Sequence, residues 1–162
     1  LNEGSVDVAV CFDCHEAHSG GRRIFAEKLY LLMPRHLSVD GAAALPCVIG
    51  YHSTYAKNLI HEGLSYVFPE QHKDIEETSH VELAVSMVES GSACTLIFGE
   101  DWKVNRQQVK EVEIHDEKGS PVWGEVYLIW TQEAYRDLKI RRFINFTEAH
   151  FKSKNPSLGE ST

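Results

Sequence analysis

The sequence contains no long apolar run and few cysteines. Its longest apolar stretch, residues 42–49, is interrupted by Pro46, whereas a membrane helix needs about 20 consecutive apolar residues. Four cysteines in 162 residues are too few for the disulfide scaffold of a small secreted domain. The first residues show neither the basic start nor the apolar segment of a secretion signal. These absences predict a cytoplasmic protein in a reducing compartment, without a membrane span.

Basic residues are also scarce. Sixteen Lys and Arg stand against 24 Asp and Glu, which gives a formal net charge of −8. Because proteins bind nucleic-acid phosphates chiefly through Lys and Arg, this chain by itself is not expected to bind nucleic acid. Hydrophobic residues make up 43% of the chain, which is enough for a packed core and excludes a disordered protein. The length fits one domain or two small lobes.

Apolar runs and amphipathic segments alternate along the chain. The runs predict strands at residues 6–12, 29–33, 47–50, 75–78, 93–98, 109–114 and 122–130. The first is apolar almost throughout, which is typical of a buried parallel strand. Residues 15–23, with two adjacent glycines, predict a loop. The alternation of strands and helices indicates an α/β fold with mostly parallel sheets.

Helix boundaries are marked by capping residues. A helix over residues 55–62 is expected to begin after Ser53 and Thr54 and to end at Gly63. Ser79 and Glu82 form a capping box before a second helix that ends at Gly91. A third helix, residues 137–151, is amphipathic. Its apolar stripe consists of Ile140, Phe143, Ile144 and Phe151.

Four stretches together resemble the effector-binding domain of LysR-type transcriptional regulators. Residues 1–10 (Leu-Asn-Glu-Gly-Ser-Val-Asp-Val-Ala-Val) are similar to the family pattern Leu-x-x-Gly-x-Leu-Asp-Leu-Ala-Ile. Residues 27–36 are similar to the family's strand that ends in Pro-x-x-His. Residues 81–98 resemble its helix–glycine–strand stretch, with Ala93 replacing the second glycine and Gly99 the final proline. Residues 126–130 and 142–146 resemble its closing strand and helix. The four occur in the family's order.

The resemblance implies a two-lobe fold like that of a type II periplasmic binding protein, with a small effector in the cleft. The first lobe would comprise residues 1–33 and 131–162, and the second lobe residues 34–130. Residues 1–4 read as the end of a helix, so the first lobe is expected to be incomplete. The family further implies a non-enzymatic sensor without a cofactor. It would form a homodimer or homotetramer and reach DNA only through an upstream helix-turn-helix domain.

Candidate effector contacts follow the predicted strands. Ligands of open α/β sheets bind at the carboxyl ends of strands, and helix N-termini present N–H groups to anions. Ser53 and Thr54 are therefore the leading candidates for binding a small anion such as a carboxylate, although Ser53 could also simply cap its helix. The remaining candidates are Tyr51, His52, Ser79, His80, Phe98, Glu100, Cys14, His15, Trp130 and Thr131. Among these, Phe98 and Trp130 are equally compatible with core packing.

One local pattern allows different chemistry. Cys11, Cys14 and His15 match the Cys-x-x-Cys-His signature of c-type haem attachment, and with His18 they could ligate a thiophilic metal. We expect neither haem nor metal, because consecutive strand residues face opposite sides and Cys11 suits a small buried apolar residue. A metal or thiol redox sensor is a competing hypothesis. A type II periplasmic-like solute-binding protein and an enzyme on a similar two-lobe fold are two more.

Overall fold

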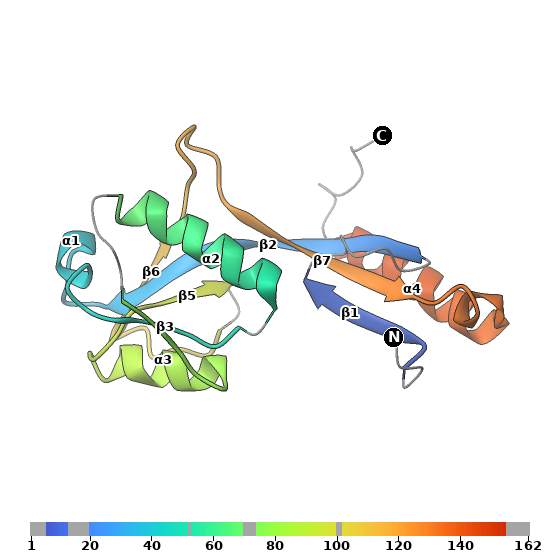
Figure 1. Ribbon diagram of the computed structural model, residues 1–162, viewed down its shortest axis with the longest axis horizontal. Coiled ribbons are helices and arrows are strands. Elements are labelled where there is room, and N and C mark those ends of the chain that lie inside the picture. The colour runs from blue at the N-terminus through green and yellow to red at the C-terminus, as the bar shows by residue number, and fades with distance from the viewer. Residues whose placement is uncertain (1–5, 13–19, 52, 70–73, 100–101, 155–162) are drawn as a thin grey trace. The chain divides into compact units, whose positions relative to one another are not determined.

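The computed structural model describes residues 6–12, 20–51, 53–69, 74–99 and 102–154, with side chains up to Phe151 (Figure 1). The chain divides into two compact units. The first unit comprises Leu1–Glu27 and Glu125–Thr162, and the second unit comprises Lys28–Gly124. Strands β2 (Gly20–Pro34) and β7 (Trp123–Trp130) each have residues in both units.

The first unit is a small antiparallel sheet covered by the C-terminal helix. Strand β1 (Val8–Phe12) pairs antiparallel with β7, and β7 lies next to β2. A short 3-10 helix η1 (Ala134–Arg136) and helix α4 (Leu138–Lys154) follow β7. The buried core consists of Ile24, Val126, Leu128, Trp130 and Ile144. Ile144 of α4 is fully buried in this core, so the helix packs against the sheet through this residue.

The prediction of a buried parallel strand at residues 6–12 is wrong. Strand β1 is antiparallel to β7, and the side chain of Val10 is 60% exposed. Val8 and Phe12 pack against the core of the first unit. The apolar composition of the segment indicated burial, but burial depends on what packs against each residue. Nothing in the described part of the chain covers Val10 in this way.

The loop predicted for residues 15–23 is a strand where it is described, because β2 begins at Gly20. A Cβ atom at Gly20 would lie 2.3 Å from Nε1 of Trp130. The glycine therefore makes room for the indole ring of Trp130. Glycine is common in loops, which is why the sequence pattern was misleading here.

The second unit has a sheet with helices on opposite faces. Strand β2 pairs antiparallel with β5 (Thr95–Phe98) on one side and with β6 (Val109–Glu113) on the other. Strands β3 (Cys47–Ile49) and β4 (Ile75–Glu77) form a small parallel sheet. The helices are α1 (Val39–Ala42), α2 (Thr54–Val67) and α3 (Val81–Glu89). Figure 1 shows α2 and α3 on either side of the strands.

Side-chain contacts identify the two faces. Val85 and Val88 of α3 pack with one set of sheet residues, Tyr30, Leu32, Ile97 and Val109. On the other face, α2 lies against Leu29 and Leu96, which are the nearest neighbours of Gly63. The alternation of β2 residues between the two clusters follows from the two-residue period of a strand.

The α/β class is correct, but the expectation of mostly parallel sheets is wrong. The main sheet is antiparallel, and the parallel pairing is between β3 and β4, with a single parallel bridge between Cys47 and Cys94. Alternating strands and helices show that helices connect successive strands. They do not show which strands pair with each other in the sheet. Here the long strand β2 runs antiparallel between β5 and β6.

The helix boundaries agree with the sequence in part. Ser53 is the N-cap of α2, as predicted, and its Oγ accepts a hydrogen bond from the Ala56 N–H at 3.1 Å. Gly91 has φ +82° and follows the end of α3, which confirms it as the helix stop. Gly63 does not end α2, which continues to Val67. A Cβ atom there would lie 2.6 Å from Cδ2 of Leu29, so this glycine lets the helix approach the sheet.

Two details of the remaining helices differ from expectation. The N-cap of α3 is His80, so the helix begins one residue later than the predicted cap at Ser79. In α4, Ile144 is buried but Phe143 is 51% exposed, because the buried side of the helix is narrower than the predicted stripe. Helical periodicity identifies the apolar side of a helix. How much of that side becomes buried depends on the size of the sheet on which the helix packs.

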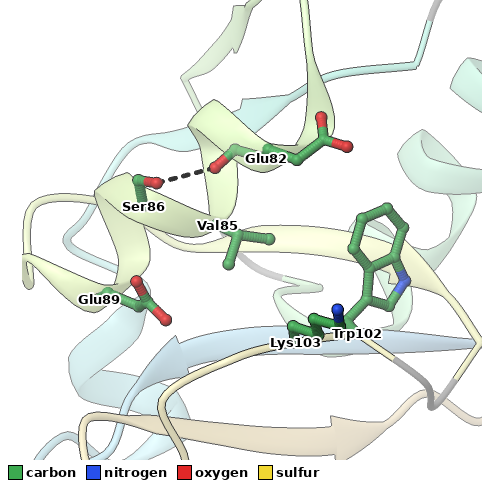
Figure 2. A pocket seen from close by; sticks show the side chains of 6 residues that line it. All are labelled: Glu82, Val85, Ser86, Glu89, Trp102 and Lys103. Carbon is green, nitrogen blue, oxygen red and sulfur yellow. Dashed lines mark hydrogen bonds between the residues drawn. The ribbon is translucent and has the colours of Figure 1, made fainter.

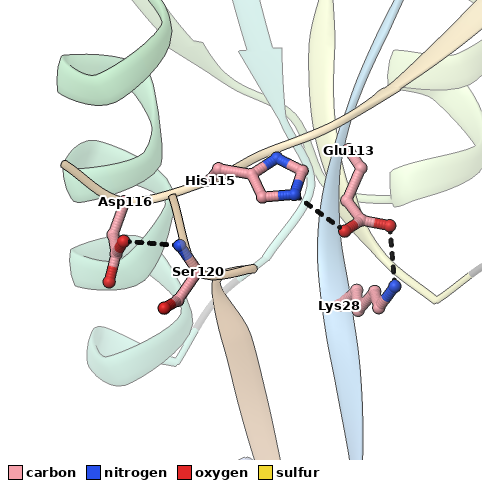
Figure 3. A network of polar contacts seen from close by, with 5 residues as sticks. All are labelled: Lys28, Glu113, His115, Asp116 and Ser120. Atoms are coloured by element: carbon pink, nitrogen blue, oxygen red, sulfur yellow. Dashed lines mark hydrogen bonds and ion pairs between the residues drawn. The ribbon is translucent and has the colours of Figure 1, made fainter. Parts of the chain in front are cut away.

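A group of polar contacts lies where β2, β6 and the turn after β6 come together in the second unit (Figure 3). Nζ of Lys28 lies 2.7 Å from Oε2 of Glu113, and Nε2 of His115 lies 3.1 Å from Oε1 of the same carboxylate. In the following turn, Oδ1 of Asp116 accepts a hydrogen bond from the Ser120 N–H at 2.8 Å. The hydrogen bond from Lys28, with its positive charge, lowers the pKa of Glu113 below its ordinary value of 4.5.

Replacing Glu113 with glutamine should therefore lower stability in a pH-dependent way. A carboxyl group with a lowered folded-state pKa stabilises the protein above its unfolded-state pKa, and this contribution is lost as the pH falls through the folded-state pKa. The gap between wild type and Glu113→Gln in urea denaturation should be small but measurable at pH 7 and should close as the pH drops below about 4.5. Lys28→Gln, which removes the positive charge beside Glu113, should behave alike. A gap that is the same at every pH would contradict this account.

Candidate functional site

The candidate site lies in the second unit, where three strands end. Strands β3 and β4 are parallel, so their carboxyl ends meet at one edge of the small sheet. The N–H of Thr78, after β4, donates a hydrogen bond to the carbonyl of Ile49 at 2.9 Å. Helix α2 follows β3 and helix α3 follows β4. Two helix N-termini therefore begin near the same edge, which is the location at which open α/β sheets bind ligands.

Gly50 brings the backbone after β3 directly against the start of α3. A Cβ atom at this position would lie 2.4 Å from the backbone nitrogen of Val81 and 2.5 Å from its Cα. Real Cβ atoms do not approach other atoms this closely. Only glycine fits there without movement of the backbone. This contact holds the beginning of α3 beside the connection that leads into α2.

Tyr51 connects this edge to the end of β5. Its hydroxyl oxygen accepts a hydrogen bond from the Phe98 N–H at 3.1 Å. Its ring also contacts the ring of Phe98 edge-on, with centroids 5.3 Å apart and planes at 80°. Phe98 is only 2% exposed. Phe98 thus belongs to the core, and its ring and backbone N–H hold the half-buried Tyr51 in position.

The N-terminus of α2 combines exposed hydroxyls with positive charge. Ser53 and Thr54 are both exposed. The first turn of α2 contains no acidic residue, so no side chain in that turn compensates the positive end of the helix dipole. Lys57 lies in the same turn, and its Nζ pairs with Oε2 of Glu77 at the end of β4 at 2.6 Å. The arrangement is suited to holding an anion.

The N-terminus of α3 begins at His80. His80 occupies the N-cap position in an extended conformation, with φ −146° and ψ 140°, and makes no side-chain capping hydrogen bond. Ser79 and His80 are exposed. His80 therefore lies at the surface beside Gly50, since its carbonyl carbon would lie 2.6 Å from a Cβ atom at that glycine.

Trp130 and Thr131 lie in the first unit, where each has a structural contact. Trp130 is 6% exposed and stacks on Tyr135, with ring centroids 5.4 Å apart. The guanidinium carbon of Arg22 lies 5.8 Å from the centre of its ring. Oγ1 of Thr131 accepts a hydrogen bond from the Ala134 N–H at 3.0 Å, at the start of η1. An additional contact of these two residues with an effector stays a prediction.

Several predicted residues lie outside the described part of the chain, namely His52, Glu100, Cys14, His15 and His18. Cys11 is half-buried in β1, opposite Tyr127 of β7. Among the described residues, no group of three or more His, Cys, Asp or Glu side chains could hold a metal ion. Helices of the described segments are all too short or too polar to cross a membrane.

The sequence analysis missed three features of this edge. The first is the contact of Gly50 with Val81, for which a glycine directly after a strand was the available signal. The second is the link between Tyr51 and Phe98. The third is the pair of Lys57 and Glu77, which lie 20 positions apart and have no signal in the sequence.

Comparison with known protein families shows to which family this chain belongs. A family model described as the LysR substrate binding domain matches residues 1–152. The chain belongs to this family. Its resemblance to LysR-type regulators is thereby confirmed, and the domain is the effector-binding regulatory part of a LysR-family transcription regulator, a family without enzymatic activity. No curated protein sequence matches the chain.

Solved structures share the fold of this LysR domain. The reduced regulatory domain of OxyR from Pseudomonas aeruginosa is 15% identical, with a TM-score of 0.68, and the match covers 93% of this chain and 74% of that one. A variant OxyR2 regulatory domain from Vibrio vulnificus is 15% identical, with a TM-score of 0.65, covering 94% and 74%. CbnR, a LysR family transcriptional regulator, is 16% identical, with a TM-score of 0.63, covering 92% and 54%. This chain thus spans about half the length of CbnR.

Proposed function

We propose that this LysR domain senses a small anion, most simply a carboxylate, at the N-terminus of α2 beside the start of α3. The observation that carries the proposal is the pair of exposed hydroxyls, Ser53 and Thr54, on a helix without an acidic residue in its first turn. A carboxylate there would meet helix N–H groups, hydroxyl donors and the positive end of the dipole together.

The hydroxyl of Ser53 can serve the helix and a ligand at the same time. Its oxygen accepts the N–H of Ala56, which leaves the hydroxyl hydrogen to be donated elsewhere. Lys57 contributes positive charge one turn into the helix. Its pairing with Glu77 also means that an incoming anion competes with a carboxylate already present. The site should therefore favour ligands that carry a full negative charge over neutral ones.

Sensing requires that the ligand distinguish two arrangements of the protein. A ligand shifts a conformational equilibrium only by the difference in its affinity for the two states. We propose that this shift passes through a homodimer or homotetramer to an upstream helix-turn-helix domain that contacts DNA, in the cytoplasm. Effector binding between the two lobes stays a prediction. So do contributions from His52, Glu100, Cys14, His15, Trp130 and Thr131.

The double substitution Ser53→Ala and Thr54→Ala should abolish most anion binding. We would measure melting temperature in a panel of acetate, succinate, benzoate and citrate at matched ionic strength, and then titrate the most stabilising anion by calorimetry. Loss of two charge-assisted hydrogen bonds should weaken binding at least about a hundredfold, since each contributes about 1.5–3 kcal/mol. Helix capping by Ser53 contributes about 1 kcal/mol of stability, so the double variant should still fold.

Ser38→Ala is the matched control for the lost cap. Oγ of Ser38 accepts a hydrogen bond from the Gly41 N–H at 3.1 Å, the same distance as in the cap of α2, but at helix α1. This variant should lose a cap and keep anion binding. Unchanged affinity in the double variant would remove the N-terminus of α2 from the effector site.

A further inference from the structure

A cavity of about 360 Å³ lies along α3 in the second unit (Figure 2). None of its lining residues belongs to the candidate effector site described above. They are Glu82, Val85, Ser86, Glu89, Trp102 and Lys103. The volume lies in the range of small-molecule pockets, and apolar and charged side chains line it together.

The apolar wall of the cavity is held in place. Nε1 of Trp102 donates a hydrogen bond to the Phe98 carbonyl at 2.8 Å. The ring of Trp102 packs on the core cluster that contains Val85, which is 6% exposed. Figure 2 shows the side chain of Val85 directed toward the indole. An aromatic ring fixed in this way is a preformed surface for a ligand, since it loses little conformational freedom on binding.

The charges around this wall are not balanced. In the described part of the chain, neither Glu82 nor Glu89 has an ion-pair partner, although Oε1 of Glu89 accepts the Asn105 N–H at 2.8 Å. Figure 2 shows the two carboxylates on either side of Val85 along α3. Lys103 brings one positive charge to the lining. Two carboxylates and one ammonium leave one net negative charge beside an aromatic face.

We propose that this cavity binds an organic monocation, an ammonium or guanidinium group with an apolar body. The positive group would contact the ring of Trp102 and the carboxylate of Glu82, and the apolar part would cover Val85. The carboxylate of Glu89, about two turns further along α3, would add negative charge to the cavity without direct contact. Cations are attracted to the negative face of an indole ring, which is the strongest aromatic partner for them. A neutral molecule of the same shape gains only the apolar contact, and an anion is repelled by the two carboxylates.

The test uses benzylammonium as the probe and benzyl alcohol as its neutral counterpart. The chain has three tryptophans, and their indole N–H signals can be followed in ¹⁵N-labelled protein by NMR, with Trp102→Phe to assign the signal. Benzylammonium should shift the Trp102 signal in a saturable way and leave those of Trp123 and Trp130 unchanged. Benzyl alcohol should bind at least about fivefold more weakly, because it lacks the cation–π and ionic contacts.

Variants that remove single carboxylates distinguish binding at this cavity from a general attraction of cations to the acidic protein. Glu82→Gln and Glu89→Gln should each weaken benzylammonium binding severalfold, whereas Glu76→Gln, on β4 and outside the cavity, should not. In Glu89→Gln, the new amide oxygen can still accept the Asn105 N–H, so that local contact is kept. Binding should persist in the Ser53→Ala and Thr54→Ala double variant, so failure of the anion site and failure of this one are distinguishable. Equal binding of the alcohol, or no saturable shift of Trp102, would overturn the proposal.

Discussion

Gly50→Ala is expected to destabilise the second unit by about 2–3 kcal/mol, a large effect for the addition of one methyl group. The new Cβ would lie 2.4 Å from the Val81 nitrogen, with backbone atoms as its three nearest neighbours. Backbone atoms cannot turn aside as the end of a side chain can. The connection after β3 must therefore separate from the start of α3. Urea denaturation followed by circular dichroism measures the loss.

The same substitution should also weaken anion binding, because it disturbs the placement of both helix N-termini. Gly41→Ala is the matched control, since a Cβ atom there would lie 3.4 Å from Oγ of Ser38, within ordinary contact distance. Alanine is also the better helix former. Gly41→Ala should thus keep or slightly raise stability. A Gly50→Ala variant as stable as wild type would show that the contact with Val81 relaxes easily and does not fix the site.

Trp130→Ala should destabilise the first unit by about 3–5 kcal/mol, the usual cost of removing a buried tryptophan. The ring is 6% exposed and stacks on Tyr135. It also fills the space that Gly20 leaves open and lies beneath the guanidinium of Arg22. All of these contacts end together when the ring is removed. The surrounding strand residues can close the resulting cavity only in part.

Urea denaturation and hydrogen exchange together test this second prediction. Exchange followed by mass spectrometry should place the loss in β7 and α4, and much less in α2 or α3. Trp130→Phe keeps an aromatic ring and should lose less stability than the alanine variant. If Trp130→Ala unfolded at the same urea concentration as wild type, the ring would not be the centre of this core.

Most secondary structure elements could be predicted from residues close in sequence. Ser53 was identified as a helix cap and Gly91 as a helix stop because both act through their own backbone conformation or through hydrogen bonds to residues a few positions away. The order of the four family-like stretches was sufficient to identify the LysR relationship. Such features survive in a single sequence, since they depend on local geometry and on the order of elements along the chain.

The candidate site could be predicted only as a set of loops. Ser53 and Thr54 stand at a helix start in the structure as they do in the sequence pattern. The residue that places them, Gly50, does so through Val81, and Tyr51 acts through Phe98. Each of these contacts joins positions tens of residues apart. A single sequence gives no indication of which distant residues meet.

The sequence by itself determined the α/β class, the positions of most helices and strands, and the family. The tertiary structure alone decided the strand pairing and the meaning of the glycines. An apolar run shows that both faces of a strand are covered, which is typical of parallel strands, but it does not show which strands lie beside it. Strand β5 is buried throughout and still pairs antiparallel with β2. Gly20 and Gly63 resemble loop residues by type, yet they lie within a strand and a helix. Their function is to admit Trp130 and Leu29 at close range, and such a requirement exists only once the chain is folded.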